Sequence, residues 1–135
     1  MAGMTSYLQK ALLDAFLNIT PFTMPAALYM SLHTADPGET GSHLNEVSTS
    51  STGYARQTLA TKMGATDSVS GISLNTATIT AGPATADWGT VSYIGIEDAS
   101  SAGNQCINGA PTTAKTVTTG IPFQLVPSQL SIQFQ

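Results

Sequence analysis

The amino-acid sequence predicts a mainly β protein, an antiparallel β-sandwich or jelly roll with a short N-terminal α-helix. Apolar residues recur at helical spacing within residues 1–20, whereas later segments alternate apolar and polar side chains over short runs. Turns rich in Gly, Pro, Asn and Asp separate these runs, as in antiparallel sheets. The length of 135 residues suits one domain. We therefore expect a single domain over 1–135, with the helix within 1–20 and the sandwich over 26–135.

The predicted helix has more apolar surface than one core-facing stripe requires. Thr5 or Ser6 can cap its N-terminus. The apolar residues at helical spacing are Leu8, Ala11, Leu12, Ala15 and Phe16. Leu13 and Leu17 fall on a flank away from this stripe. Either the helix is sunk deeply against a sheet, or Leu13 and Leu17 contact a second chain.

A first strand and a long loop follow the helix. Pro21 and Pro25 end the helix, and Leu28 to His33 reads as a strand whose even-numbered apolar residues share the inner face. The next segment, residues 34–53, is rich in Ser, Thr, Gly and acidic residues and opens with an Asp-Pro-Gly turn. Loops of this length in a compact domain are usually functional or disordered. We expect an extended arm or contact loop here.

The remaining strands are short and end at turn residues. We predict them at 54–61, 72–80, 91–97, 106–110, 115–119, 123–126 and 130–134. The alternation changes register within 72–80, so a bulge is expected near Asn75. The single tryptophan, Trp88, lies in the turn before 91–97. Trp88, Tyr93, Ile96 and Phe134 are predicted to anchor the core or a self-interface, with the core preferred for Trp88 and Tyr93.

The low charge of the chain limits the kinds of partner that it can bind. Charged residues make up 9% of the chain, against roughly 25% in an ordinary soluble domain. Four cationic residues and a net charge of −4 cannot neutralise a phosphate backbone. We therefore expect no nucleic-acid partner. A surface rich in Ser and Thr suits contact with protein, because burying a hydroxyl costs less than burying an unpaired charge.

Membrane association and disulfide bonding are also disfavoured. No apolar stretch approaches the roughly 20 residues that span a bilayer. The N-terminus lacks the basic segment and apolar run of a secretory signal. We expect synthesis in a cytoplasm and no membrane contact. The single cysteine, Cys106, excludes an intramolecular disulfide, and its strand context favours a small buried hydrophobe.

The sequence contains no convincing chemical site. The candidate metal-ligand set matches no zinc or calcium spacing, so no metal is expected. That set is His33, Asp36, Glu39, His43 and Glu46. No Gly-x-Ser-x-Gly elbow or glycine-rich phosphate loop is present. Asp87, Glu97 and Asp98 are interpreted as acids of a solvated turn. The prediction is a protein that is not an enzyme and carries no cofactor.

Three segments carry a resemblance to a known family. They are Tyr7-Leu8 with Leu12 to Phe16; Pro25 to Gly38, which leads through an acidic loop to Gly53-Tyr54-Ala55-Arg56-Gln57; and Ala84 to Ala99 with Asp87-Trp88-Gly89, followed by Thr112 to Val117. In these segments the chain resembles a family of small proteins of tailed bacteriophages and prophages. Members of that family are labelled tail-fibre-like proteins or capsid cement (decoration) proteins. The resemblance implies a virion component, and cement proteins have jelly-roll-like folds.

The resemblance leaves two locations on the virion open. Our first hypothesis is a capsid cement protein on the outer capsid surface, which stabilises the mature shell by bridging subunits of the major capsid protein. The alternative is a tail-associated fibre, baseplate or receptor-binding protein. A carbohydrate-binding jelly roll is a third class, disfavoured because few aromatic residues are available. We also expect a homo-oligomer, most simply a dimer. The predicted partner-binding residues are Leu13, Leu17, Phe22, Asp36, Glu39 and His43.

Overall fold

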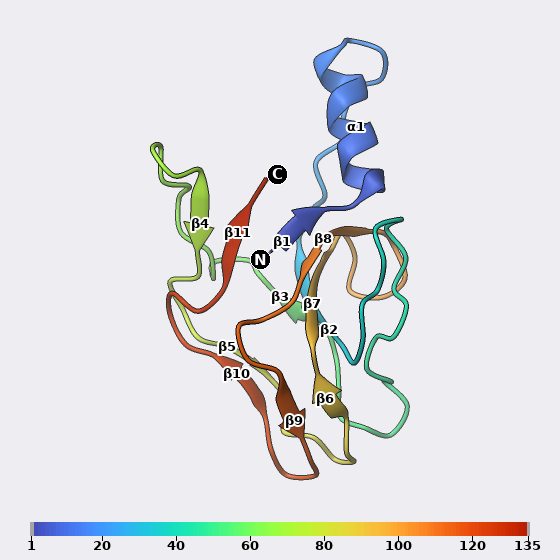
Figure 1. Ribbon diagram of the computed structural model, residues 1–135, viewed down its shortest axis with the longest axis vertical. Helices are drawn as coiled ribbons and strands as arrows, with labels where there is room; N and C mark the ends of the chain where they lie inside the picture. Colours follow the sequence, from blue (N-terminus) through green and yellow to red (C-terminus); the bar gives the residue numbers. More distant parts are fainter. Residues whose placement is uncertain (1, 135) are drawn as a thin grey trace.

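A computed structural model describes residues 2–134 and confirms a mainly β fold with one short helix (Figure 1). The elements in chain order are β1 (Ala2–Met4), α1 (Ser6–Phe16), β2 (Tyr29–His33), β3 (Gln57–Thr58), β4 (Ile72–Leu74), β5 (Ile79–Ala81), β6 (Gly89–Val91), β7 (Tyr93–Glu97), β8 (Gln105–Gly109), β9 (Lys115–Val117), β10 (Phe123–Leu125) and β11 (Ser131–Gln133). Five strands form an antiparallel sheet in the order β1-β8-β7-β2-β3. The others form two-stranded antiparallel ladders, β5 with β10, β4 with β11, and β6 with β9.

The two faces of the five-stranded sheet differ in chemistry. β2 and β7 pair so that Met30 lies opposite Ile96, and both side chains belong to the core. On the other face Ser31 lies opposite Gly95. Successive side chains of a strand point to opposite faces, so the sequence of β2 places apolar residues on one face and polar residues on the other. Both Ser31 and His33 are fully buried.

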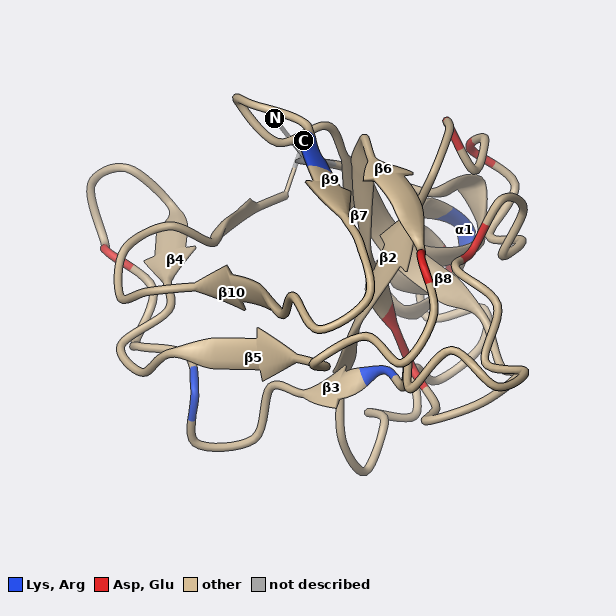
Figure 2. Ribbon diagram, turned by 90° about the horizontal axis from the view of Figure 1, so that it is seen from below, with Lys and Arg blue, Asp and Glu red and all other residues tan. Residues whose placement is uncertain are grey.

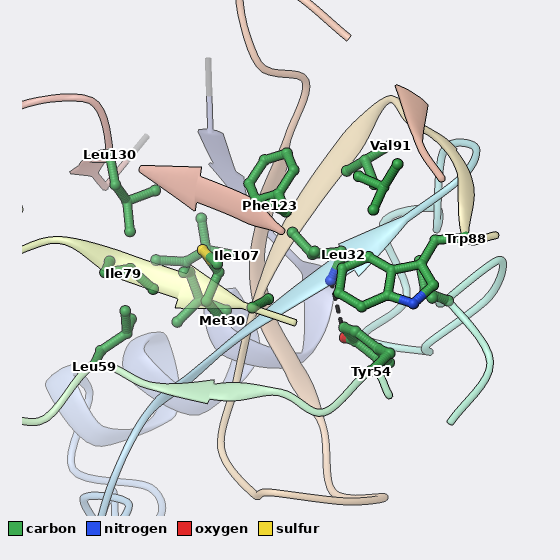
Figure 3. Packing of buried hydrophobic residues seen from close by; sticks show 14 of the residues in the cluster. Met30, Leu32, Tyr54, Leu59, Ile79, Trp88, Val91, Ile107, Phe123 and Leu130 are labelled. Carbon is green, nitrogen blue, oxygen red and sulfur yellow. Dashed lines mark hydrogen bonds between the residues drawn. The ribbon is translucent and has the colours of Figure 1, made fainter. Parts of the chain in front are cut away.

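The core lies between the apolar face of this sheet and the two-stranded ladders. Figure 3 shows Met30, Leu32 and Ile107 of the sheet near buried residues of the ladders, which include Ile79, Val91 and Phe123, and near Leu130, which precedes β11. Trp88 packs at one side of this core, where its ring meets Tyr54 edge to face at a centroid distance of 5.4 Å. Its indole Nε1 donates a hydrogen bond to the Thr52 carbonyl over 2.8 Å. The indole therefore fixes the end of loop 34–53 to the core.

Helix α1 projects from the body and is not sunk against the sheet (Figure 1). Its N-cap Thr5 is buried: the hydroxyl accepts from the Leu8 amide and donates to the Gln105 carbonyl over 2.7 Å. Leu8 is the one buried residue of α1, with 5% of its surface exposed. The helix ends where Asn18 takes a positive φ of 58°, a conformation that asparagine tolerates better than most residues. The deeply buried helix that was one of the two expectations is therefore wrong.

The single strand predicted over 72–80 is two strands in the structure. β4 and β5 are separated around Asn75, which is buried with 1% of its surface exposed. Its amide donates to the carbonyls of Ala77 and Val126 over 3.0 Å each and accepts from the Leu130 amide over 2.8 Å. These bonds replace a ladder at this point, so the expected bulge is an interruption held by one side chain.

Other boundaries also shift. The strand predicted over 91–97 divides into β6 and β7 at Ser92, whose amide donates to the His33 carbonyl over 2.9 Å. The strand predicted over 54–61 shortens to β3. The short strand β1, which the sequence analysis did not predict, pairs with β8 at the sheet edge. Cys106 is buried in β8.

Candidate functional site

A buried polar cluster joins loop 34–53 to the polar face of the sheet. The loop packs along this face instead of extending into solvent. The Nδ1–H of His33 donates to the Leu44 carbonyl over 2.8 Å, and the backbone amide of Gln105 donates to the Gly41 carbonyl over 2.9 Å. The loop is thus an ordered cover of the sheet. The extended arm, one of the two expectations for this segment, is wrong, and its role as a contact loop stays a prediction.

Glu97 lies at the centre of this cluster with no exposed surface. Its Oε1 accepts from the Ser31 hydroxyl over 2.7 Å and from the Gln105 side-chain amide over 2.9 Å, and its Oε2 accepts from His43 Nδ1 over 3.1 Å. Burial by itself raises the pKa of Glu97, but the polar side chains of His33, Ser31 and Gln105 and the charge of Arg56 outweigh burial and lower this pKa to about 2. The carboxylate is therefore ionised inside the protein.

Arg56 forms a second set of buried interactions beside Glu97. Its guanidinium donates from Nε and Nη2 to both oxygens of Glu46 over 2.8 Å each, a bidentate pair. Nη1 donates to the carbonyls of Ala99 and Ala102 over 2.9 Å and 2.8 Å. The Tyr54 hydroxyl also donates to Glu46 over 2.9 Å. These bonds hold loop 34–53 and the 98–104 turn against each other.

The geometry of this cluster supports a structural role. Ser31 Oγ lies 2.9 Å from His33 Nε2, but its hydrogen is directed to Glu97, and both residues have no exposed surface. Across residues 2–134, every buried side-chain nitrogen or oxygen has a hydrogen-bond partner. The buried polar atoms of the cluster are therefore all paired within the protein.

The residues that the sequence grouped as candidate metal ligands take part in different interactions in the structure. His33, His43 and Glu46 each have their own hydrogen-bond partners in the cluster, while Asp36 and Glu39 are exposed. Within the described part of the chain, no group of three His, Cys, Asp or Glu side chains is placed to hold a metal ion.

Glu97 was missed as a buried residue. Interpreting it as part of a solvated turn is wrong, because it is the last residue of β7 and faces the covered side of the sheet. The available signal was its alternation with Gly95, since both residues lie on the same face of one strand. The absence of a side chain at Gly95 leaves the room that the cluster occupies.

One end of the molecule exposes large apolar side chains. We call residues 13–24 the apolar arm; it comprises the second half of α1 and the turn after it. Its exposed apolar residues are Leu13, Phe16, Leu17, Ile19 and Met24. Phe16 is 83% exposed. The two charged side chains of this helix, Lys10 and Asp14, pair with each other. Apolar patches of this kind on a small protein mark contact sites.

An apolar groove lies beside the arm. It has a volume of about 850 Å³ and runs between the segment 25–28, the loop 66–71 and the end of β11. Val69, 95% exposed, and Phe134, 60% exposed, stand at its border. None of the described residues that line it is charged. The neighbouring carboxylate of Asp67 accepts from the amides of Val69 and Ser70 and so shapes the loop.

The residues predicted to bind partners do not form one patch. Leu13 and Leu17 are exposed on the apolar arm, at 56% and 55%, whereas Phe22 is half-buried against the core. The Glu39 carbonyl accepts from the Ser6 amide, so Glu39 lies at the opposite end of α1. Asp36 is exposed on the same loop as Glu39, and His43 binds Glu97.

The predicted core or self-interface residues also divide. Trp88 and Ile96 are buried in the core, and Tyr93 is half-buried. Phe134 lies outside the core at the groove border, so only the interface role remains open to it. Exposed apolar residues at 16, 19, 24 and 69 were missed, because the helical pattern assigned Phe16 to the inner stripe and loop positions carry no burial signal.

The opposite end of the molecule is rich in hydroxyl groups. There β6 pairs with β9, and the hydroxyls of Thr90 and Thr116 bond across the ladder over 2.8 Å. Asp87 accepts from both the amide and the hydroxyl of Thr119. Figure 1 places this ladder and α1 at opposite ends of the long axis. Figure 2 shows that charged residues are sparse over the whole fold.

Comparison with known proteins identifies the family. A family model described as podophage GP4 fiber I protein gp80 matches residues 3–133. The chain belongs to this gp80 family. Members of the gp80 family are structural proteins of the phage virion, named as fibre proteins. No curated protein matches the chain. Among residues 2–134, no helix is long and apolar enough to cross a bilayer.

Proposed function

We propose that the protein is a structural component of the phage tail fibre apparatus, joined to the rest of the virion through its apolar arm. The observation that carries the proposal is the exposure of five large apolar side chains on a projecting helix and turn, in a chain of the fibre family. The buried polar cluster contributes a rigid fold and takes no part in chemistry.

The energetics of the arm support an attachment role. Fully burying a side chain such as Phe16 or Met24 stabilises a contact by about 2 kcal/mol. The arm therefore offers several such contributions to a partner and, being nearly free of charge, imposes little desolvation cost. The hydroxyl-rich β6–β9 end lies farthest from α1 (Figure 1). An attached molecule would thus present this polar end outward.

Capsid cement is the competing assignment. It accounts equally well for a compact domain with an apolar contact, but the family's name favours the tail. Copy number separates the two assignments, because cement covers the shell whereas fibres occupy only the tail. We expect quantitative mass spectrometry of purified virions to find far fewer copies of this protein than of the major capsid protein. A ratio near one copy per capsid subunit would overturn the tail assignment in favour of cement.

A phage that encodes Phe16→Glu tests the attachment role of the arm. We expect its virions to contain less than about a tenth of the normal amount of this protein, because a carboxylate in an apolar contact is strongly unfavourable. Leu44→Glu is the matched control, since Leu44 is also exposed and apolar but lies on loop 34–53. Normal incorporation of the Phe16→Glu protein, measured by mass spectrometry, would contradict the proposal.

A further inference from the structure

A second cavity opens on the core side of the five-stranded sheet. It has a volume of about 510 Å³ and is lined from β7, β8, β9, β10 and β11, within the roughly 300–1,000 Å³ of ordinary small-molecule sites. In Figure 1, β10 and β11 stand on one side of this region and β7 and β8 on the other. We call it the Lys115 cavity, because Lys115 is the one charged residue among the described residues that line it.

The side chains of the Lys115 cavity divide into an apolar floor and a polar rim. The aliphatic side chains are buried or half-buried and form the floor: Ile94, Ile96, Ile107, Leu125, Leu130 and Ile132. The uncharged polar side chains are exposed and form the rim: Thr112, Thr113, Gln124, Ser128, Gln129 and Ser131. This division suits an amphipathic ligand, whose apolar part leaves water while its polar end stays at the surface.

Lys115 selects the charge of that polar end. The side chain is exposed, and its Nζ donates to the Pro122 carbonyl over 2.9 Å and lies 5.9 Å from the centre of the Phe123 ring. Across residues 2–134, no carboxylate forms an ion pair with it. An ammonium group has three N–H donors, so Lys115 can bind an anionic group as well as the Pro122 carbonyl.

Other classes of small molecule fit this cavity less well. A single cation cannot neutralise the several charges of a polyphosphate. Phe123, the one aromatic ring among the described lining residues, is only 3% exposed, so it offers no open face for a nucleotide base. The rim amides already bond within the protein: Gln124 donates to the Thr80 hydroxyl, and Gln129 accepts from the Val126 amide. The aliphatic floor and the cation therefore decide the ligand.

We propose that the Lys115 cavity binds one unbranched acyl chain that ends in an anionic group. The chain lies along the aliphatic floor, and the anionic group pairs with the Lys115 ammonium at the rim. None of the described lining residues belongs to the apolar arm, so this site goes beyond the proposed attachment role and does not depend on it. A free fatty acid and the acyl chain of an anionic membrane lipid both have this chemistry.

A series of ligands with different head groups tests the charge. Isothermal titration calorimetry compares decanoate, decanol and decyltrimethylammonium, each below the concentration at which it forms micelles. We expect decanoate to bind at one molecule per chain and about tenfold more tightly than decanol, with the cation weakest. Equal affinities for decanoate and decanol, or no binding of decanoate, would overturn the inference.

Lys115→Gln tests the residue that supplies the charge. We expect it to weaken decanoate about tenfold and to leave decanol unchanged. Lys62→Gln is the matched control, because the Lys62 ammonium also donates to a backbone carbonyl, that of Thr78, but does not line the cavity. An equal loss of decanoate binding in the two variants would refute the role of Lys115.

Two phenylalanine variants test where the chain lies. Ile94→Phe narrows the Lys115 cavity and should weaken decanoate and decanol alike, by more than about tenfold. Ala60→Phe narrows the apolar groove instead and should change neither. The reverse pattern would place the ligand in the groove and overturn the inference. Circular dichroism checks the fold of both variants, and Lys115→Gln, which replaces an exposed side chain, decides the matter if Ile94→Phe does not fold.

Chain length and vesicle binding identify the form of the ligand. Each buried methylene adds about fourfold to affinity, so octanoate should bind roughly fifteenfold more weakly than decanoate. An affinity that does not change with chain length would overturn burial of the chain. Sedimentation with phosphatidylglycerol vesicles then separates the two sources. Binding that is lost in Lys115→Gln supports a lipid chain, whereas decanoate binding without vesicle binding supports a free fatty acid.

Discussion

Gly95 is the residue on which the buried polar cluster most directly depends. It lies opposite Ser31 in the sheet, on the face that carries Glu97. A Cβ built at this position would overlap the side chains of Gln105 and Ser31 and lie 3.0 Å from Glu97 Oε1. The glycine is therefore required for space, not for an unusual backbone angle.

Replacement of this glycine should be costly. We expect Gly95→Ala to lower the free energy of unfolding by about 3 kcal/mol, because an added methyl group in a full interior displaces hydrogen-bonded side chains. Gly3→Ala is the control, since a Cβ at Gly3 meets nothing within 4 Å. Urea denaturation measures both variants. Equal stability of the two would show that the cluster has room to rearrange.

The ionised carboxylate of Glu97 makes the free energy of unfolding depend on pH. Its pKa is about 2 in the folded protein against an ordinary value of 4.5. A lowered folded-state pKa adds stability that is complete above the ordinary value and is lost as the pH falls toward the folded one. The groups that face this carboxylate are Ser31, His33 and Gln105 from the sheet, His43 from the loop, and Arg56.

We therefore expect the free energy of unfolding to fall by a few kcal/mol between about pH 4.5 and pH 2 on account of Glu97. Glu97→Gln should be less stable at neutral pH, because it removes the negative charge to which Ser31, Gln105 and His43 donate hydrogen bonds. It should also lose less stability over the acid range. Denaturation curves at a series of pH values give the comparison, and parallel slopes for the two proteins would refute the role of this group.

At the scale of elements, Asn75 joins two ladders into one ribbon. β4 pairs with β11 and β5 with β10, and the interruption between them is bridged by the Asn75 side chain. This ribbon carries loop 66–71 and so forms one wall of the groove. The position of the groove therefore rests on one buried amide.

Asn75→Ala should destabilise the protein by about 3 kcal/mol, because the Leu130 amide and the Ala77 and Val126 carbonyls would lose their partner. Thr76→Ala is the neighbouring control, since Thr76 is exposed and its hydroxyl makes only a long bond of 3.4 Å to Lys62. Thermal unfolding followed by circular dichroism compares them. A loss no larger than that of the control would show that the ribbon does not depend on this amide.

At the scale of the molecule, the two ends of the long axis differ in surface chemistry. The apolar arm and groove occupy the α1 end, and the hydroxyl-rich β6–β9 ladder occupies the other (Figure 1). The two ends are joined by one core and by loop 34–53, which is bonded across the sheet. The apolar end and the hydroxyl-rich end therefore belong to one continuously packed body.

Local patterns were enough to predict the fold class, the helix and most strands. Helical spacing ends at Phe16 and period-two alternation begins near Leu28, and both follow from how side chains project from each backbone. The strand ends were less predictable: Ser92 and Asn75 interrupt strands through bonds to residues far along the chain.

The character of the candidate sites was decided by tertiary contacts. Glu97 is buried because loop 34–53 covers it. The loop is ordered because its His43 bonds to Glu97 and its Glu46 bonds to Arg56. Phe16 is exposed because α1 leaves the sheet after its first turns. Local sequence determines backbone periodicity, whereas the burial of a side chain depends on which segments, distant in the sequence, pack against it. The arm and the groove are therefore formed only when the chain has folded.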